Sequence, residues 1–246
     1  MAVLVTQVPD TTTKIKIGAD GKSIDEEGIT WILNPYAEFA LEKALKIGEA
    51  RSDVEEVVLI SMGPKRTVEA LRQGLAMGAD RAILIKSDVI NTDEITAQVK
   101  ELGADLILGG KKSIDSESSW IEAAVAAKLD VPLLHNINRI DCEGETLVAS
   151  REVSGETQSF EVATPSVITC DKGDDEPRYA SMMGIMKAKK KQLDEQDSSA
   201  ADNLGIEIVE ATLPAPRSEV KIIEGETAEE KAEKLITALR DEAKVL

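Results

Sequence analysis

Short apolar, β-branched runs alternate with amphipathic stretches through the first half of the chain. This alternation is typical of a parallel β-sheet whose strands are joined by crossover helices. The apolar runs have few polar interruptions, which suits strands that are covered on both faces. The expected strands of this sheet are residues 3–8, 57–61, 82–85 and 106–108.

The stretches between these strands carry apolar residues at helical spacing. The first expected helix begins at Asn34, a residue type that caps helix N-termini, and has Pro35 in its first turn. A second helix is expected to end at Gly78, because glycine is a common helix C-cap. Ile95, Val99 and Leu102 mark a third helix, and a fourth is expected to end near Pro132.

The pattern changes after the fourth helix. Shorter runs, with Gly144 and Gly155 in the turns between them, predict antiparallel strands appended to the parallel sheet. These strands are residues 134–140, 146–152, 158–162 and 167–170. The predicted fold class is therefore α/β, with a mostly parallel sheet, crossover helices, appended antiparallel strands and an extended C-terminal arm.

The packed core is expected to end near Cys170. Residues 171–224 show little hydrophobic periodicity, and one last helix is expected at residues 228–245. A structureless stretch of this length would be unusual inside a compact domain. We therefore expect the C-terminal arm to lie along another subunit.

Composition narrows the choice of partners and compartment. The 246 residues include 29 basic and 46 acidic side chains, and the net charge of −17 makes nucleic acid and anionic membranes poor partners. Two cysteines cannot form the disulfide framework of a small secreted domain. No basic leader opens the sequence, and no apolar run approaches the roughly 18 residues of a membrane span. We expect a cytoplasmic protein without membrane insertion.

The sequence lacks the residue constellations of common catalytic sites. The single histidine, His135, lies in a strand-like run without a cysteine or serine motif beside it, which favours a structural role. Cys142 and Cys170 have no second Cys/His pair to complete a zinc site. The nucleophile-elbow, phosphate-loop and zinc-protease motifs are also absent. We expect neither catalytic nor metal-binding residues.

One segment has the features of a ligand site. Residues 108–119 begin at the end of an apolar strand, pass through Gly109 and Gly110, and lead into a helix. Ligands of doubly wound sheets bind beyond the carboxyl ends of the strands, where glycines let a phosphate approach backbone N–H groups at a helix start. The same residues could equally form a plain turn with Ser118 as the helix cap. Glu117 and Glu122 would oppose a phosphate there.

A basic cluster stands out in this acidic chain. Residues 187–191 contain four lysines, and they follow the apolar residues 182–186. Composition alone favours a solvated face beside a packed segment. The alternative is a docking element, because methionine side chains adapt to irregular partner surfaces.

Seven segments in register, nearly end to end, resemble the β subunit of electron transfer flavoprotein. They are Val-Pro-Asp at 8–10, Asn-Pro-Tyr at 34–36 with Glu38, Ala-Met-Gly-Ala-Asp-Arg at 76–81, Gly-Lys at 110–111 with Ile-Asp at 114–115, Arg-Glu-Val at 151–153 leading to Pro-Ser-Val-Ile-Thr at 165–169, Glu-Pro-Arg-Tyr-Ala at 176–180, and Ile-Met-Lys-Ala-Lys-Lys-Lys at 185–191.

The resemblance implies an α/β core of the nucleotide-hydrolase-like type in a heterodimer with an α subunit. The pair would hold one FAD, mainly through the α subunit. This flavin would take electrons from acyl-CoA type dehydrogenases and pass them to an acceptor. This chain would then be a scaffold and docking surface and not an enzyme. The implied divisions are a core at residues 1–170, a docking segment at 171–191, and an arm at 192–246 that packs on the α subunit.

The resemblance also implies site residues. Family members that bind AMP in the β subunit hold it with positions that correspond here to Leu4, Asn34, Ser61, Gly110, Lys111, Ile114, Asp115, Ser118 and Ser119. The dehydrogenase-docking loop corresponds to residues 179–185, with Met182 as the apolar anchor and with Met183 and Ile185 beside it.

Several positions depart from the family pattern. Leu4 and Thr6 replace a small residue and a lysine, and Trp120 and Glu122 stand at the start of the loop helix. An indole there would crowd a phosphate, and a carboxylate would repel it. The helix dipole offsets only about 1 kcal/mol of that repulsion. These residues therefore count against AMP binding. Two other interpretations therefore stay open: a stand-alone nucleotide-binding protein of the stress-protein type, and a scaffold without cofactors.

Overall fold

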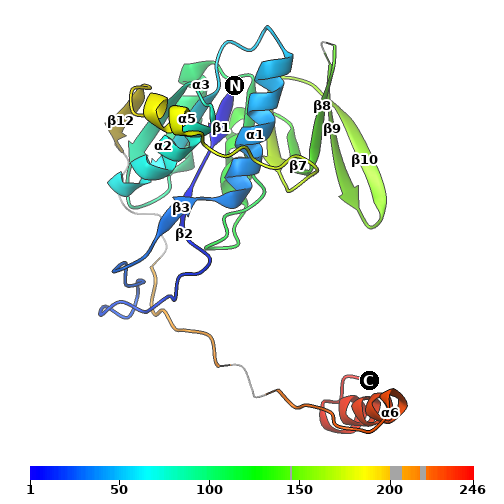
Figure 1. Ribbon diagram of the computed structural model, residues 1–246. Coiled ribbons are helices and arrows are strands. Elements are labelled where there is room, and N and C mark those ends of the chain that lie inside the picture. Colours follow the sequence, from blue (N-terminus) through cyan, green and yellow to red (C-terminus); the bar gives the residue numbers. More distant parts are fainter. Residues whose placement is uncertain (145, 200–206, 217–219) are drawn as a thin grey trace. The chain divides into compact units, whose positions relative to one another are not determined.

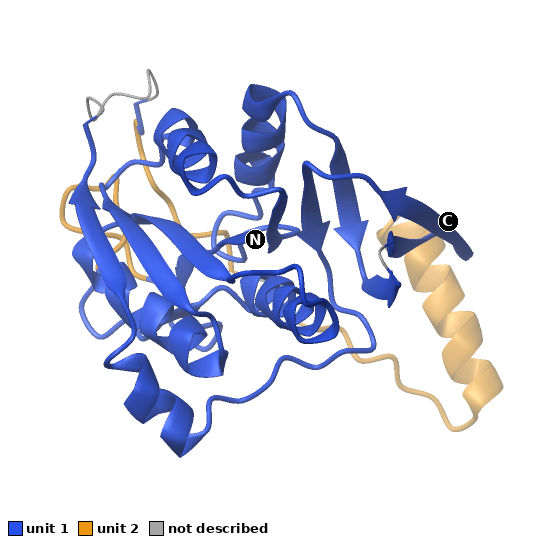
Figure 2. Cartoon of the chain, turned by 90° about the horizontal axis from the view of Figure 1, so that it is seen from above, with its two compact units in different colours: residues 1–15, 26–208 blue, residues 16–25, 209–246 orange. Residues whose placement is uncertain are grey.

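The computed structural model describes residues 1–144, 146–199, 207–216 and 220–246, and it divides into two compact units (Figure 2). Residues 1–15 and 26–208 form the larger unit, and residues 16–25 and 209–246 form the smaller one. Parts of the expected C-terminal arm, residues 200–206 and 217–219, lie outside the described residues.

The larger unit is built on a seven-stranded sheet in the order β12-β5-β4-β1-β6-β11-β7 (Figure 1). All six neighbouring pairs are parallel. The strands are β1 (Ala2–Leu4), β4 (Val58–Gly63), β5 (Arg81–Lys86), β6 (Leu106–Gly110), β7 (Leu133–Ile137), β11 (Ser166–Cys170) and β12 (Leu193–Asp197).

Helices cover both faces of this sheet. Successive residues of a strand point to opposite faces, so Val3 packs in one apolar cluster with α1 and α2, whereas Leu4 packs in another with α3 and α4. The helices are α1 (Pro35–Ala50), α2 (Val68–Met77), which follows a short 3₁₀ turn (Lys65–Thr67), α3 (Thr92–Leu102) and α4 (Trp120–Leu129).

The predicted α/β class is confirmed, but two of the predicted antiparallel strands belong to the parallel sheet. β11 pairs in parallel with β6 on one side and with β7 on the other. The antiparallel strands are β8 (Arg139–Glu143), β9 (Thr146–Val153) and β10 (Glu156–Val162), which form a separate three-stranded sheet. This sheet is inserted in the chain between β7 and β11. Gly144 and Gly155 therefore lie in the turns of the inserted antiparallel sheet, and they carry no information about β7 and β11 on either side of it.

The main sheet extends beyond the expected end of the core. After Cys170 the chain forms α5 (Met182–Ala188), which packs against α2, and then β12, which pairs in parallel with β5. β12 has the sequence Leu-Asp-Glu-Gln-Asp, and only its first residue is not exposed. A strand at a sheet edge buries little apolar surface, and so its sequence carries no hydrophobic pattern.

The first expected strand, residues 3–8, is two strands. β1 ends at Leu4, and β2 (Gln7–Pro9) turns away to pair antiparallel with β3 (Trp31–Leu33). The backbone N–H of Asn34 donates to the carbonyl oxygen of Thr6 at 2.9 Å. This short ladder brings the start of α1 next to the end of β1.

The smaller unit contains α6 (Ala228–Thr237), which continues as a π-helical turn (Ala238–Glu242) and confirms most of the predicted last helix. Thr227 caps α6, because its Oγ accepts a hydrogen bond from the N–H of Glu230 at 3.2 Å. No residue of α6 is buried within this chain, and Leu235 and Ile236 are each 46% exposed. Across the described parts of the chain, none of the helices has both the length and the apolar character needed to cross a membrane.

Candidate functional site

A cavity of about 190 Å³ lies beyond the carboxyl ends of the central strands. Its walls come from the ends of four strands: Thr6 follows β1, Gly63 ends β4, Asp88 follows β5, and Asp115 follows β6. The chain passes from β1 to β4 and β5 on one side, and β6 lies on the other side of β1. This reversal of strand order is the usual ligand position in doubly wound sheets.

The predicted site residues are distributed around this cavity and a smaller one. Asp115 and Ser118 line the larger cavity. Leu4 and Ser61 line a neighbouring space of about 10 Å³, and the Ser61 hydroxyl donates to the carbonyl oxygen of Val5 at 2.8 Å. Both of these residues are buried, so they belong to the packed core next to the larger cavity. The other predicted positions, which line neither cavity, are Asn34, Gly110, Lys111, Ile114 and Ser119.

Asn34 and Gly110 position the loop that follows β6. The Asn34 side chain is 3% exposed, and its Nδ2 donates to the carbonyl oxygen of Lys112 at 2.9 Å. A Cβ on Gly110 would lie 2.8 Å from the Cβ of Tyr36 and 2.9 Å from the backbone nitrogen of Ala37. The start of α1 therefore lies directly on the backbone of β6, and Asn34 ties the loop to that helix start.

The two lysines of this loop are both paired with carboxylates. Lys111 Nζ lies 2.8 Å from an oxygen of Asp171, and it also stands over the ring of Tyr36. Lys112 forms an ion pair with Glu117, which adopts a left-handed conformation at φ 55°. Because both ammonium groups already pair with carboxylates, neither lysine is free to bind a phosphate.

Glu122 is a nearly buried ionisable group at this edge of the sheet. It lies in the first turn of α4, is only 8% exposed, and lines the smaller cavity with Leu4 and Ser61. Burial raises the pKa of its carboxyl to about 7, and a hydrogen bond from its own backbone N–H offsets only part of that shift. Near neutral pH, a substantial fraction of Glu122 is an uncharged carboxylic acid.

Sequence reasoning missed two charged residues of the larger cavity. Arg66 follows the end of β4, where it stacks on Trp31 at 3.8 Å from the ring centroid and pairs with Glu26 at 3.1 Å. Asp88 lines the cavity directly after β5. Their positions after predicted strands could have indicated them, since the carboxyl ends of parallel strands meet at one edge of a sheet.

A second surface is formed by the segment that resembles a docking loop. It is a short helix, α5, preceded by Tyr179, and Ser181 caps it by accepting from the N–H of Gly184 at 3.0 Å. Large apolar side chains are exposed on it to an unusual degree. Tyr179 is 97% exposed, Met182 79%, Met183 67%, Ile185 44% and Met186 68%.

The exposed helix is firmly attached to α2. A Cβ on Gly184 would lie 2.5 Å from the carbonyl oxygen of Ala76, so only glycine permits this approach. Arg72 on α2 donates to the carbonyl oxygens of Ala188 at 2.6 Å and Lys191 at 2.8 Å. Lys191 in turn donates to the last carbonyl groups of α2 and the residues after it, Leu75, Gly78 and Ala79. Lys191, one of the basic cluster, is thus a helix cap and not part of a solvated face.

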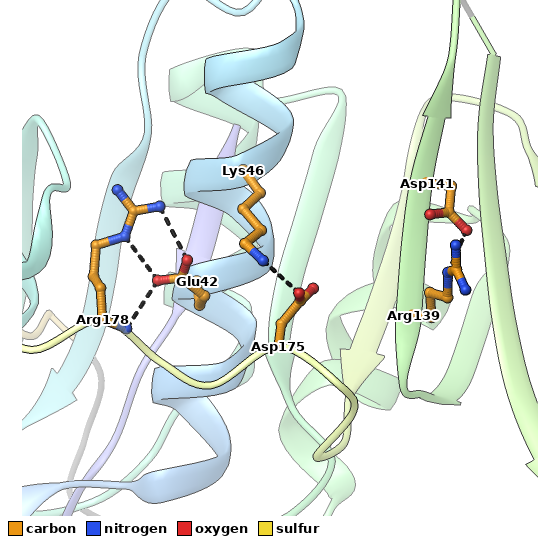
Figure 3. A network of polar contacts seen from close by, with 6 residues as sticks. All are labelled: Glu42, Lys46, Arg139, Asp141, Asp175 and Arg178. Carbon is orange, nitrogen blue, oxygen red and sulfur yellow. Dashed lines mark hydrogen bonds and ion pairs between the residues drawn. The ribbon is translucent and has the colours of Figure 1, made fainter.

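The chain between β11 and α5 is fastened to α1 by Arg178 (Figure 3). Its guanidinium donates to both carboxylate oxygens of Glu42, at 2.8 Å and 3.0 Å, and to Glu49 at 2.6 Å. The Glu42 side chain is 4% exposed, and these ion pairs raise the pKa of Arg178 above its usual value. Asp175 forms a further ion pair with Lys46 one turn along α1. The segment that leads to α5 is therefore anchored at both ends.

The fold and these surfaces define a doubly wound α/β protein with an anchored, methionine-rich exposed helix. Within the described residues, no group of three His, Cys, Asp or Glu side chains could hold a metal ion. The model of the electron transfer flavoprotein domain matches residues 22–201. The chain belongs to this family, as a β subunit.

Relatives named electron transfer flavoprotein subunit beta are similar along most or all of the chain. The one from Bacillus subtilis is 34% identical over 258 residues, covering 99% of this chain and 98% of the relative. The mitochondrial one from Arabidopsis thaliana is 35% identical over 254 residues, with 99% and 98% covered. The one from Homo sapiens is 33% identical over 201 residues, with 78% of each chain covered. The family resemblance seen in the sequence is confirmed.

Replacing Glu122 with Gln should remove a pH-dependent loss of stability. Between pH 4.5 and 7, the unfolded state releases the Glu122 proton while the folded state keeps it, so the free energy of unfolding falls as pH rises. The difference in unfolding free energy between the wild type and Glu122→Gln should change by about 3 kcal/mol over this window, in favour of the variant at pH 7. Urea titrations of both chains at pH 4.5, 5.5, 6.5 and 7.5 measure it, and parallel curves would contradict a raised pKa.

Replacing Arg178 with Ala should destabilise the chain by about 2 kcal/mol, because the buried Glu42 carboxylate is left without its cation. Arg139→Ala is the matched control, since Arg139 and Asp141 are exposed to 61% and 39% and such surface pairs contribute under about 1 kcal/mol (Figure 3). Urea midpoints at pH 7 compare the two variants. Equal losses in both would show that the Glu42 pair has no special role.

Proposed function

We propose that this chain is the β subunit of a heterodimeric, FAD-containing electron carrier, in which an α subunit holds most of the flavin. The carrier accepts electrons from acyl-CoA type dehydrogenases and passes them to an acceptor. This chain acts as the scaffold of the pair and as the surface on which the dehydrogenase docks. It performs no reaction with catalytic residues of its own.

The observation that carries this proposal is the anchored apolar surface of α5. Met182, Met183 and Ile185 project from a helix that is held by Gly184 and Lys191, so the backbone under them is already ordered. Binding costs less when the binding element is preorganised, and the unbranched methionine side chains can still adapt to the partner. An ordered helix backbone that carries adaptable methionine side chains suits repeated, transient docking of dehydrogenases.

The larger cavity supports placing FAD mainly in the α subunit. Among the described residues that line it, Arg66 is the one cation, and one nitrogen of its guanidinium already pairs with Glu26. Asp88 and Asp115 contribute two carboxylates. A flavin dinucleotide carries a pyrophosphate, which needs cations or free backbone donors. These residues do not fit that group.

The part of the C-terminal arm that belongs to the smaller unit, residues 209–246, supports the heterodimer. Its last helix, α6, buries no residue in this chain, although Leu235 and Ile236 lie on it. A helix with an apolar side that finds no cover in its own chain is stabilised by packing against a partner. The proposed partner for this surface is the α subunit.

The proposed location is the cytoplasm. Both cysteines are free thiols, and burial raises the pKa of the Cys170 thiol to about 12. A thiol with such a pKa is inert. Free, unreactive cysteines suit the reducing compartment expected from the sequence.

Co-expression with the α subunit should yield a yellow complex that contains one copy of each chain and about one FAD. This chain expressed alone should be colourless, since its own cavity does not suit the flavin pyrophosphate. Size-exclusion chromatography with detection at flavin wavelengths measures both. Colourless chains that elute separately from the co-expression would contradict the proposal.

Met182→Ala in the heterodimer should weaken docking of the dehydrogenase and leave the flavin content unchanged. Truncating a buried anchor commonly costs about 2 kcal/mol, which is roughly a 30-fold rise in Kd. Stopped-flow measurement of flavin reduction at increasing dehydrogenase concentration gives this value, and rates at saturating dehydrogenase should recover.

Lys100→Ala serves as the control for this variant. Lys100 is exposed on α3, which packs on the opposite face of the sheet from α2 and α5. Its substitution should leave both the concentration dependence and the flavin content unchanged. An unchanged concentration dependence in Met182→Ala would remove Met182 from the docking surface.

A further inference from the structure

Two neighbouring features occupy the strand end beside the larger cavity, and the first is the contact between Gly109 and Glu122. A Cβ on Gly109 would lie 2.5 Å from Glu122 Cγ and 2.8 Å from its carboxyl carbon. The Glu122 side chain therefore lies directly on the backbone of β6, where a phosphate would have to approach the strand end. The missing side chain at position 109 is what makes room for the carboxyl.

The second feature is that donors of the loop are already used within the chain. The N–H of Ser113 donates to the carbonyl oxygen of Ser118 at 2.8 Å, and the N–H of Ser116 donates to Asp115 at 2.7 Å. Glu122 lies in the first turn of α4 and is only 8% exposed. First-turn N–H groups are the donors that bind phosphates at helix starts. A buried carboxyl therefore stands in the turn that would have to bind the phosphate.

The charges around the site act in the same direction. The ammonium groups of Lys111 and Lys112 are neutralised by Asp171 and Glu117. A phosphate dianion placed beside this loop would lose its water shell next to two lysines that are already paired, with the carboxyl of Glu122 beside it. Burying a charge without a partner is strongly unfavourable.

We infer that the Glu122–Gly109 contact is the specificity determinant that excludes nucleotide phosphates from this chain, so that the heterodimer holds FAD but no AMP. The inference rests on the proposed function, because it concerns the same heterodimer. Glu122 takes the place of a bound phosphate, because its carboxyl fills the space against Gly109 at the end of β6. The edge of the sheet is thus stabilised by a residue of the chain and needs no ligand.

The nucleotide content of the co-expressed heterodimer tests this inference. Denaturation followed by quantitative chromatography should release about one FAD per complex and less than about one tenth of an equivalent of AMP. In Glu122→Gly, the carboxyl no longer fills the strand end, so AMP should bind at least 100-fold more tightly than in the wild type. Glu122→Gln keeps the volume without the charge and should bind AMP no better than the wild type.

Each outcome decides the matter. One equivalent of AMP released from the wild-type heterodimer would overturn the inference, and so would a Glu122→Gly heterodimer that retains FAD and gains no affinity for AMP. If Glu122→Gly fails to fold, calorimetric titration of AMP into the wild-type heterodimer still decides, because micromolar binding would refute the exclusion. A heterodimer that lacks FAD would instead count against the proposed function, so the two failures are distinguishable.

Discussion

The arrangement of the site depends on a stretch of backbone without side chains at the end of β6. Gly110 lets the first turn of α1 lie against the strand, and Gly109 leaves the space that the Glu122 side chain occupies. Two helices from opposite faces of the sheet therefore meet one strand end. Any side chain at either position would force a helix away, because packed interiors do not accommodate added volume without strain. The position of the loop after β6 follows from this constraint.

Helix α5 depends on a different feature, a firm attachment beneath exposed apolar side chains. Hydrogen bonds from Arg72 and Lys191 satisfy carbonyl groups at the ends of α5 and α2, which would otherwise be left without donors. Upstream, the pair between Arg178 and Glu42 fixes the connecting chain on α1. The apolar side chains of α5 contribute little to this attachment, since most of their surface is exposed. Their sequence is thus free to be shaped by a partner.

Much of the fold was predictable, because the helices α1 to α4 and the strands between them bury apolar faces that leave a periodic pattern. Where burial is slight, the pattern fails: β12 is an edge strand of mostly acidic residues, and β3 has only three residues. The parallel pairing of β11 was missed because it depends on an inserted sheet and not on local residues. Asn34 and Gly110 stood out in the sequence through their motifs, and the structure places them against the loop after β6, while their role in ligand binding stays a prediction. The near-neutral pKa of Glu122 could not be predicted, since it comes from burial by distant parts of the chain.

The acidic character of β12 has a consequence for the behaviour of the molecule at high concentration. An open sheet edge exposes unpaired backbone groups that can recruit a strand from another molecule. On β12, the exposed side chains include Asp194, Glu195 and Asp197. A second copy that tried to extend the sheet would bring its own acidic strand against them, and like charges directly opposite each other are destabilising. The acidic side chains of β12 therefore disfavour pairing of this sheet edge with a second copy and so disfavour aggregation through it.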